Sequence, residues 1–300
     1  MHISLFCLLF FMAEKGSCFL LNKTKNLQAD KRLEYVLEGK MNKDIVIFGS
    51  SIGAGNILAG EIEKAQNLKT YNLSYHGSDA IFHKFLLETL LKFNEVPEKV
   101  ILVIDNPFYF KKKALTFRND ALKPLSQYSY INNKLIENDQ NSFYSKFLYL
   151  GRLNKDMIHF KPKEKNQENP LDDFGSQPLL NLKKHPTSIA STENSYTSEV
   201  EAYSKVEAFK AIQDLCKENE IELICVFTPS FRLHNTVFIE RFKELIDKDV
   251  SNVFVYDISN EAYTNKLNYY DAAHLNTNGA KIFTSELNNY LASLEKKKLN

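Results

Sequence analysis

The feature that most constrains this 300-residue chain is an alternation of short apolar runs with longer amphipathic runs. The short runs are rich in Val, Ile, Leu and Phe, which is typical of buried strands. We expect strands at residues 44–49, 68–74, 99–105, 221–229 and 252–258. Helical spacing between them predicts an α/β fold, a three-layer α/β/α sandwich around a five-stranded parallel sheet.

The alternation stops between residues 111 and 198, a polar stretch rich in Asn, Lys and Tyr. We interpret this stretch as an insertion, serving as a lid or partner surface, within a single α/β domain of residues 40–298. A poorly ordered excursion is the alternative. Within the stretch, residues 141–153 have the pattern of a weak helix.

The N-terminus carries a strongly apolar run from Ile3 to Ala13. This run is shorter than the roughly 20 residues that a membrane-crossing helix needs. No Lys or Arg precedes it, and no clear cleavage site follows it. We interpret residues 1–25 as an export signal or the stub of a membrane anchor, which predicts an exported or membrane-anchored, extracytoplasmic protein. A first helix or strand packed on the domain is the alternative.

Composition excludes some partners. The 38 basic residues nearly balance the 37 acidic residues, so there is no charge excess that would favour nucleic acid. The cysteines and four of the histidines lack the spacing of metal ligands. These residues are Cys7, Cys18, Cys216, Cys225, His83, His159, His185 and His234. We therefore expect no metal site and no cofactor; the oligomeric state is left open.

The segment from Ile45 to Asn56 has two competing interpretations. Its three glycines have a spacing found in short-chain dehydrogenases: Gly49, Gly53 and Gly55. A nucleotide-binding oxidoreductase also needs an acidic residue at the end of the second strand, where this chain has Asn72 and Ser74. The Tyr-x-x-x-Lys pair of that family, Tyr109 and Lys113, follows the third strand, too early in the chain.

The second interpretation makes Ser51 a nucleophile exposed in a turn after the first strand. A serine hydroxyl needs a base to take its proton and a carboxylate to orient that base. Asp271 and His274 stand three residues apart, after the last strand and before the final helix. Because ligands of parallel sheets bind beyond the carboxyl ends of the strands, both segments can reach one crevice. The simpler roles are a helix cap for Ser51, a turn residue for Asp271 and a polar helix-start residue for His274.

The order of these segments resembles the SGNH (GDSL-like) hydrolases over residues 44–110 and 200–295. The nucleophile turn of that family, Gly-Asp-Ser, matches Gly49-Ser50-Ser51, with Ser50 in place of the Asp. The glycine of the second block matches Gly77, within residues 71–79. The asparagine of the third block matches Asn106, although Ile104 and Pro107 replace its neighbours. The final Asp-x-x-His block matches Asp271 and His274.

The resemblance implies a catalytic triad of Ser51, His274 and Asp271, with an oxyanion hole from the Ser51 and Gly77 amides and the Asn106 side chain. It implies a serine esterase that acts on O-acyl esters, with O-acetyl esters favoured, of a small molecule or a cell-surface glycan. The alternatives are an O-acyltransferase to a sugar hydroxyl and an inactive glycan-binding or assembly protein. Asp105 is a second candidate for the triad carboxylate, and His76 is either a pocket residue or an exposed loop imidazole.

Overall fold

The structure is a computed structural model that describes residues 2–26, 28–153, 168–180, 196–231 and 235–299. The chain divides into two compact units. Unit 1 comprises Met1–Glu34 and Arg118–Lys165, and unit 2 comprises Tyr35–Phe117 and Asn166–Asn300. The short helix α2 (Arg32–Leu37) includes residues of both units.

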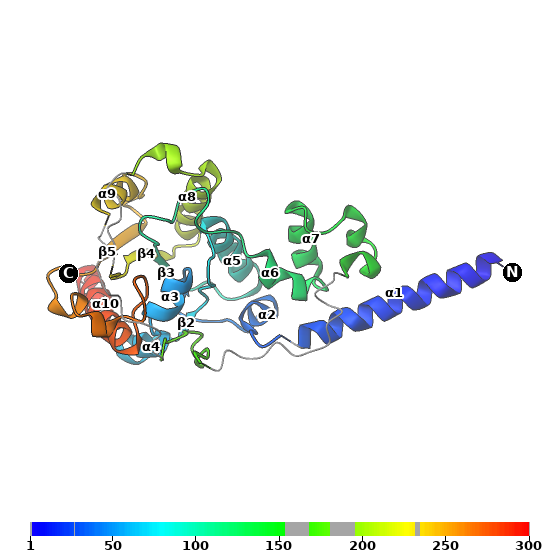
Figure 1. The fold of residues 1–300 in the computed structure, drawn as a ribbon, viewed down its shortest axis with the longest axis horizontal. Coiled ribbons are helices and arrows are strands. Elements are labelled where there is room, and N and C mark those ends of the chain that lie inside the picture. The colour runs from blue at the N-terminus through cyan, green and yellow to red at the C-terminus, as the bar shows by residue number, and fades with distance from the viewer. Residues whose placement is uncertain (1, 27, 154–167, 181–195, 232–234, 300) are drawn as a thin grey trace. The chain divides into compact units, whose positions relative to one another are not determined.

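Unit 2 is built on one parallel sheet of five strands in the order β2-β1-β3-β4-β5 (Figure 1). The strands are β1 (Ile45–Phe48), β2 (Thr70–Asn72), β3 (Lys99–Val103), β4 (Glu222–Phe227) and β5 (Ser251–Val255). All four neighbouring pairs are parallel, with Val46, for example, opposite Tyr71 on one side and Val100 on the other. The five strands predicted from the apolar runs are confirmed. Each strand is shorter than its predicted range, because the ranges also include residues of the adjoining loops.

Helices cover both faces of this sheet. They are α3 (Ser51–Asn56), α4 (Ala59–Gln66), α5 (Ala80–Phe93), α8 (Tyr203–Glu218), α9 (Thr236–Glu244) and α10 (Thr277–Leu299). Figure 1 shows α4 and α10 on one face and α5, α8 and α9 on the other. The predicted three-layer α/β/α arrangement is therefore confirmed. The described residues of this unit also form short 3₁₀ turns at Ser198–Val200, Glu261–Tyr263 and Lys266–Asn268.

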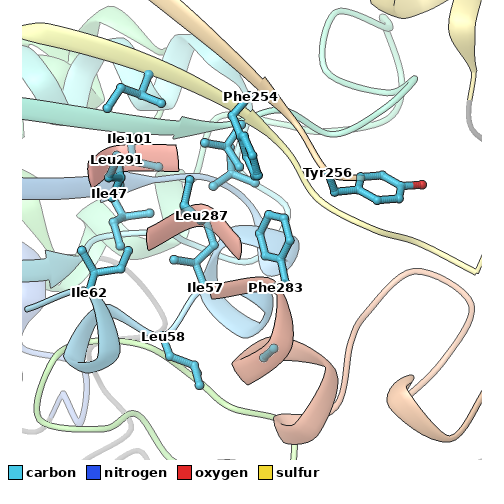
Figure 2. Packing of buried hydrophobic residues seen from close by; sticks show 14 of the residues in the cluster. Ile47, Ile57, Leu58, Ile62, Ile101, Phe254, Tyr256, Phe283, Leu287 and Leu291 are labelled. Carbon is cyan, nitrogen blue, oxygen red and sulfur yellow. The ribbon is translucent and has the colours of Figure 1, made fainter. Parts of the chain in front are cut away.

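The core follows from the two-residue period of the strands. Alternate strand residues such as Ile47, Ile101 and Phe254 point toward the face covered by α4 and α10, where they meet Phe283 and Leu287 (Figure 2). On the opposite face aromatic rings fill the space between sheet and helices. There the ring of Phe227 lies 5.2 Å from that of Phe242, which in turn lies 4.9 Å from that of Phe209. The helices on the two faces bury most of the sheet, and its partly exposed residues lie mainly in the edge strands β2 and β5.

The described residues of unit 1 form α1 (His2–Asn26), α6 (Asn119–Leu122) and α7 (Ser129–Glu137), together with the 3₁₀ turns η1 (Lys123–Leu125), η2 (Phe143–Lys146) and η3 (Tyr149–Arg152). In α1, residues His2–Thr24 have a mean hydropathy of 1.7, and α1 is the one helix in the described parts of the chain long and apolar enough to cross a membrane. The apolar run of Ile3 to Ala13 is thus only the first half of a longer helix.

The single helix predicted over residues 141–153 is wrong, because η2 and η3 replace it. The reason lies in the carbonyl of Ser145, which accepts hydrogen bonds from Asn132 Nδ2 at 3.0 Å and Arg152 Nε at 2.8 Å. In an α-helix that carbonyl would accept from the amide of Tyr149. The Tyr149 amide instead donates to Glu14 Oε1 at 2.6 Å. Side chains therefore divert the hydrogen bonds that a continuous helix needs.

The stretch predicted as an insertion, residues 111–198, contributes to both units. Residues 118–165 belong to unit 1, and the described residues 168–180 belong to unit 2. In unit 2 this second part runs along the sheet edge and the site helices: the Asn72 amide donates to the Phe174 carbonyl, and the Gln177 amide donates to the Ala54 carbonyl. The insertion residues 154–167 and 181–195 lie outside the described residues.

Candidate active site

The turn after β1 places two consecutive serines at the start of helix α3. Ser50 is the N-cap: its Oγ accepts a hydrogen bond from the Ile52 amide at 3.3 Å. Ser51 is the first residue of the helix and is partly exposed, whereas Ser50 is buried. Ser50 therefore caps the helix, which was the simpler role considered for Ser51. The Ser51 hydroxyl is thus available for another partner.

That partner is the ring of His274. Ser51 Oγ and His274 Nε2 lie 2.8 Å apart, within hydrogen-bond reach. The other ring nitrogen, Nδ1, faces the Asp271 carboxylate at 2.9 Å from Oδ1 and 3.0 Å from Oδ2. A carboxylate accepts only, so Nδ1 carries the proton and Nε2 accepts from the serine hydroxyl. The three residues predicted as a triad are brought together in the order that proton transfer from serine requires.

Asp271 is held by its own turn. Its Oδ1 also accepts hydrogen bonds from the amides of Ala273 at 2.8 Å and His274 at 2.9 Å. Partial burial acts to raise the pKa of Asp271, but the His274 ring and these two amides outweigh it and lower the pKa to about 2. The carboxylate therefore stays ionised at neutral pH and can stabilise a protonated imidazole.

Asp105, the other carboxylate considered for the triad, has a different partner. It is buried at the end of β3, and its Oδ1 accepts a hydrogen bond from Ser50 Oγ at 2.6 Å. Burial raises its pKa to about 6, against the lowering effects of the Ser50 hydroxyl and the nearby His274. The second oxygen, Oδ2, is buried without a hydrogen-bond partner among the described residues. The hydrogen bond of Asp105 thus goes to Ser50, the residue before Ser51, rather than to His274.

The glycines of the turn serve close packing. A Cβ at Gly49 would lie 2.9 Å from the Cβ of Val103, and a Cβ at Gly53 would lie 2.6 Å from Ser74 Oγ. Helix α3 therefore sits directly against the ends of β1 and β3, at a distance that side chains do not permit. The third glycine, Gly55, has only ordinary contacts with Gln177 and Leu179. Packing explains two of the three glycines that the nucleotide interpretation assigned to phosphate binding.

Gly77 lies in a turn tied to the end of β1. The Tyr75 amide donates to the Gly49 carbonyl at 2.9 Å, so the two loops run side by side. Gly77 itself has φ of +70°, a left-handed conformation that favours glycine. The next residue, Ser78, places its Oγ 2.9 Å from the Gly49 carbonyl and 2.8 Å from the Nε2 of buried His83. The turn predicted to supply an oxyanion donor is thus hydrogen-bonded to Gly49, which lies two residues before Ser51.

His83 itself was predicted only as lacking metal spacing. Burial lowers its pKa to about 3, so the ring is neutral. Its Nδ1 lies 3.2 Å from the hydroxyl of Tyr109, which is fully buried. The tyrosine that the dehydrogenase interpretation required is therefore a core residue that no substrate reaches.

Asn106 does not direct its amide to Ser51 in any hydrogen bond among the described residues. Its Nδ2 donates to the Asn235 carbonyl at 3.4 Å, and its Oδ1 is buried without a partner in the described part of the chain. Asn106 therefore has a weak hydrogen bond to the loop that starts α9. Its predicted role as an oxyanion donor stays a prediction.

Asn56, the last residue of α3, was missed by the sequence reasoning. Its buried side chain accepts a hydrogen bond from the Leu275 amide at 2.9 Å and donates to Thr228 Oγ1 at 3.1 Å. Leu275 follows His274 directly, so Asn56 connects the helix that carries Ser51 with the loop that carries the histidine. No local pattern indicates such a contact, because its partners lie 219 and 172 residues away in the chain.

His76 is exposed, and its Nε2 lies 2.6 Å from Gln177 Oε1. Of its two predicted roles, the exposed loop imidazole describes its position. Among the described residues no group of three or more His, Cys, Asp or Glu side chains is arranged to hold a metal ion. All four cysteines are free thiols, and Cys216 and Cys225 are buried.

Comparison of the chain with protein-family models finds no matching family, and comparison with curated proteins finds no match.

Proposed function

We propose that this protein is a serine esterase of the SGNH type that cleaves O-acyl esters through an acyl-serine intermediate. The observation that carries the proposal is the continuous hydrogen-bonded chain from Ser51 Oγ through the His274 ring to the Asp271 carboxylate. Such a hydrogen-bonded chain raises the nucleophilicity of the serine hydroxyl, because the carboxylate holds the histidine ring in the tautomer whose Nε2 can accept the proton.

The first half of the reaction forms the acyl-enzyme. Ser51 Oγ attacks the ester carbonyl while its proton passes to His274 Nε2, and Asp271 stabilises the resulting imidazolium. Backbone amides at Ser51 and Gly77 are the proposed donors to the oxyanion, with the Asn106 side chain as a third. His274 then returns the proton to the departing alkoxide oxygen, and the C–O bond breaks. The acyl group remains on Ser51.

The second half depends on the acceptor. Water activated by His274 releases a carboxylic acid and restores the serine, whereas a sugar hydroxyl takes the acyl group as a new ester. Both outcomes use the same residues. We favour hydrolysis of an O-acetyl ester on a small molecule or cell-surface glycan, in line with the family resemblance, and treat transfer to a sugar and an inactive glycan-binding scaffold as the alternatives.

The N-terminal helix supports a location at the membrane. Its 23-residue apolar stretch is long enough to serve as a signal anchor or a membrane span. We propose that the chain is exported or anchored with its α/β unit outside the cytoplasm.

The test is hydrolysis of a short-chain aryl acetate by the full-length protein and by Ser51→Ala. The proposal expects turnover that Ser51→Ala abolishes and that Ser204→Ala, a change of an exposed serine on α8, leaves unchanged. A serine-directed phosphonate should label Ser51. Labelling with negligible hydrolysis favours transfer to a sugar. Absence of labelling in folded protein, or hydrolysis that survives Ser51→Ala, contradicts the proposal.

A further inference from the structure

Unit 1 exposes a group of large apolar side chains. Five of them lie in η2, η3 and their junction, here called the aromatic stretch: Phe143, Tyr144, Phe147, Tyr149 and Leu150. Phe143 and Phe147 pack edge to face with ring centroids 5.6 Å apart, so these two exposed rings are contiguous, and all five residues lie between positions 143 and 150 of the chain. Single exposed apolar residues are ordinary on soluble proteins, whereas a contiguous patch marks a contact surface.

The aromatic stretch is attached to α1 at one defined point. Both oxygens of the Glu14 carboxylate accept hydrogen bonds from η3, Oε1 from the Tyr149 amide at 2.6 Å and Oε2 from the Leu150 amide at 3.0 Å. Toward its C-terminus α1 buries the side chains of Ser17, Leu21 and Thr24, which share one helix face. The second half of α1 is therefore packed within unit 1.

The first half of α1 has no such packing. Every residue from 2 to 13 is exposed, among them Phe6, Leu9 and Phe11. At about 1.5 Å per residue these twelve residues extend roughly 18 Å beyond the Glu14 contact. That length is more than half of the roughly 30 Å hydrocarbon core of a bilayer. A helix that is apolar all round and unpacked requires an apolar surrounding.

These two features belong to one surface. The exposed part of α1, residues 2–13, ends directly before Glu14, and Glu14 binds the aromatic stretch through the Tyr149 and Leu150 amides. The two apolar features are therefore adjacent in unit 1. Phe and Tyr side chains, with the exposed Lys146 among them and the exposed Lys15 next to Glu14 on α1, are the composition found at the lipid headgroup layer. A carboxylate is costly at the centre of a bilayer, whereas at this layer Glu14 keeps its hydrogen bonds and access to water.

We infer that the aromatic stretch is a second membrane contact: residues 2–13 enter the bilayer, and residues 143–150 rest on its surface beside them. The occupant of the patch is lipid, and Glu14 marks the boundary. The inference depends on α1 entering the membrane and is independent of whether Ser51 is a nucleophile.

The chain has no tryptophan, so one introduced tryptophan reports its own position. Three full-length variants are compared in vesicles with brominated lipids: Leu9→Trp, Phe147→Trp and, as control on unit 2, the exposed site Tyr203→Trp. We expect quenching of Leu9→Trp by bromines deep in the acyl chains, quenching of Phe147→Trp by bromines near the headgroups, and none for Tyr203→Trp. An unquenched Phe147→Trp, one quenched by the deep bromines, or an unquenched Leu9→Trp overturns the inference.

A second measurement uses partition into vesicles containing anionic lipid. Phe143→Ser/Tyr144→Ser/Phe147→Ser should weaken the partition of the full-length chain by about 10- to 100-fold, because three partly exposed aromatic rings lose their transfer into lipid. The matched control changes three exposed apolar residues of unit 2, Tyr203→Ser/Val237→Ser/Leu267→Ser, and should leave partition unchanged. Equal partition of both triple variants contradicts a lipid contact. Aryl acetate hydrolysis, measured without vesicles, tests the proposed function separately.

Discussion

Ser51 Oγ and His274 Nε2 lie 2.8 Å apart although 223 residues separate them in the chain. Several hydrogen bonds hold the loop that carries His274. A bridge pairs Tyr269 with Leu275, the Tyr270 amide donates to the His274 carbonyl, and Asn56 accepts from the Leu275 amide. Only the last of these connects the histidine loop directly to the helix of the serine.

Asn56 is therefore expected to control the alignment of the triad. In Asn56→Ala the buried Leu275 amide loses its acceptor, which costs about 1–3 kcal/mol of stability. The turnover number for an aryl acetate should fall by at least ~10-fold while KM changes little, because the hydroxyl and the imidazole lose alignment rather than substrate contacts. Steady-state kinetics and thermal unfolding measure the two effects.

The matched control for Asn56 is Thr284→Val. Thr284 is also fully buried, and its Oγ1 accepts a hydrogen bond from the Leu58 amide at 3.1 Å, away from the histidine loop. This variant should lose a comparable amount of stability and keep its turnover number. If Thr284→Val slows turnover as much as Asn56→Ala does, the loss reflects general destabilisation and Asn56 has no positioning role.

The two aspartates near the site should differ in their effect on turnover. Asp271→Asn removes the charge that orients and stabilises the His274 ring, so turnover should fall by ~10³- to 10⁴-fold, the range known for such triads. Asp105→Asn keeps an acceptor for the Ser50 hydroxyl and should cost far less. Labelling rates with a serine-directed phosphonate rank the two variants independently of substrate. The reverse ranking would make Asp105 the triad carboxylate.

Two glycines of α3 provide a test of the packing around the nucleophile. Gly53→Ala places a methyl group 2.6 Å from Ser74 Oγ, so either the Ser74 side chain or helix α3 must shift, at an expected cost of about 1–3 kcal/mol. Gly55→Ala meets only atoms at 3.5 Å or more and should be neutral or gain up to about 1 kcal/mol, because alanine favours helix. Urea denaturation and aryl acetate turnover separate the variants. Equal stability and equal turnover of the two variants would show that Gly53 does not lie as close to Ser74 as described.

Local sequence patterns predict much of unit 2 because its strands are buried on both faces. Runs such as residues 100–104 are continuously apolar, and a strand in the middle of a parallel sheet requires that composition. The chain order of these runs, together with polar residues at their ends, was enough to bring Ser51, Asp271 and His274 into one hypothesis. The sheet order brings the segments that carry those residues to the same edge of the sheet, and the loop contacts set the distances between them.

Long-range side-chain contacts explain what was not predicted. The bond between Ser50 and Asp105 crosses 55 residues, and those of Asn56 cross 172 and 219. Hydrogen bonds of this kind leave no periodic pattern. The helix predicted at 141–153 is wrong for a related reason, since Asn132 and Arg152 take the Ser145 carbonyl that a helix would use. Side-chain contacts from elsewhere in unit 1 therefore override the local helix propensity of this segment.

The burial of Asp105 predicts a pH dependence of stability with a definite sign. Its pKa is about 6 in the folded protein, because burial disfavours the charged form, and 3.8 is its ordinary value. Between these two values the folded state binds more protons at this site than the unfolded state does. The contribution of Asp105 to the free energy of unfolding is therefore fully present below pH 4, and it declines as the pH rises toward and past 6.

Asp105→Asn removes this dependence and keeps the shape of the neutral acid. The variant and the natural protein should have similar stability at pH 4, where Asp105 is protonated in the fold. At pH 7 the variant should be more stable by on the order of 3 kcal/mol, the free energy that a pKa difference of about two units represents. The comparison is made by urea denaturation of both proteins at pH 4, 5, 6 and 7, with Asp173→Asn, a change in an exposed carboxylate of unit 2, as control. A stability difference between Asp105→Asn and the natural protein that stays constant from pH 4 to pH 7 would mean that Asp105 titrates normally, and that its buried position beside Ser50 is incorrect.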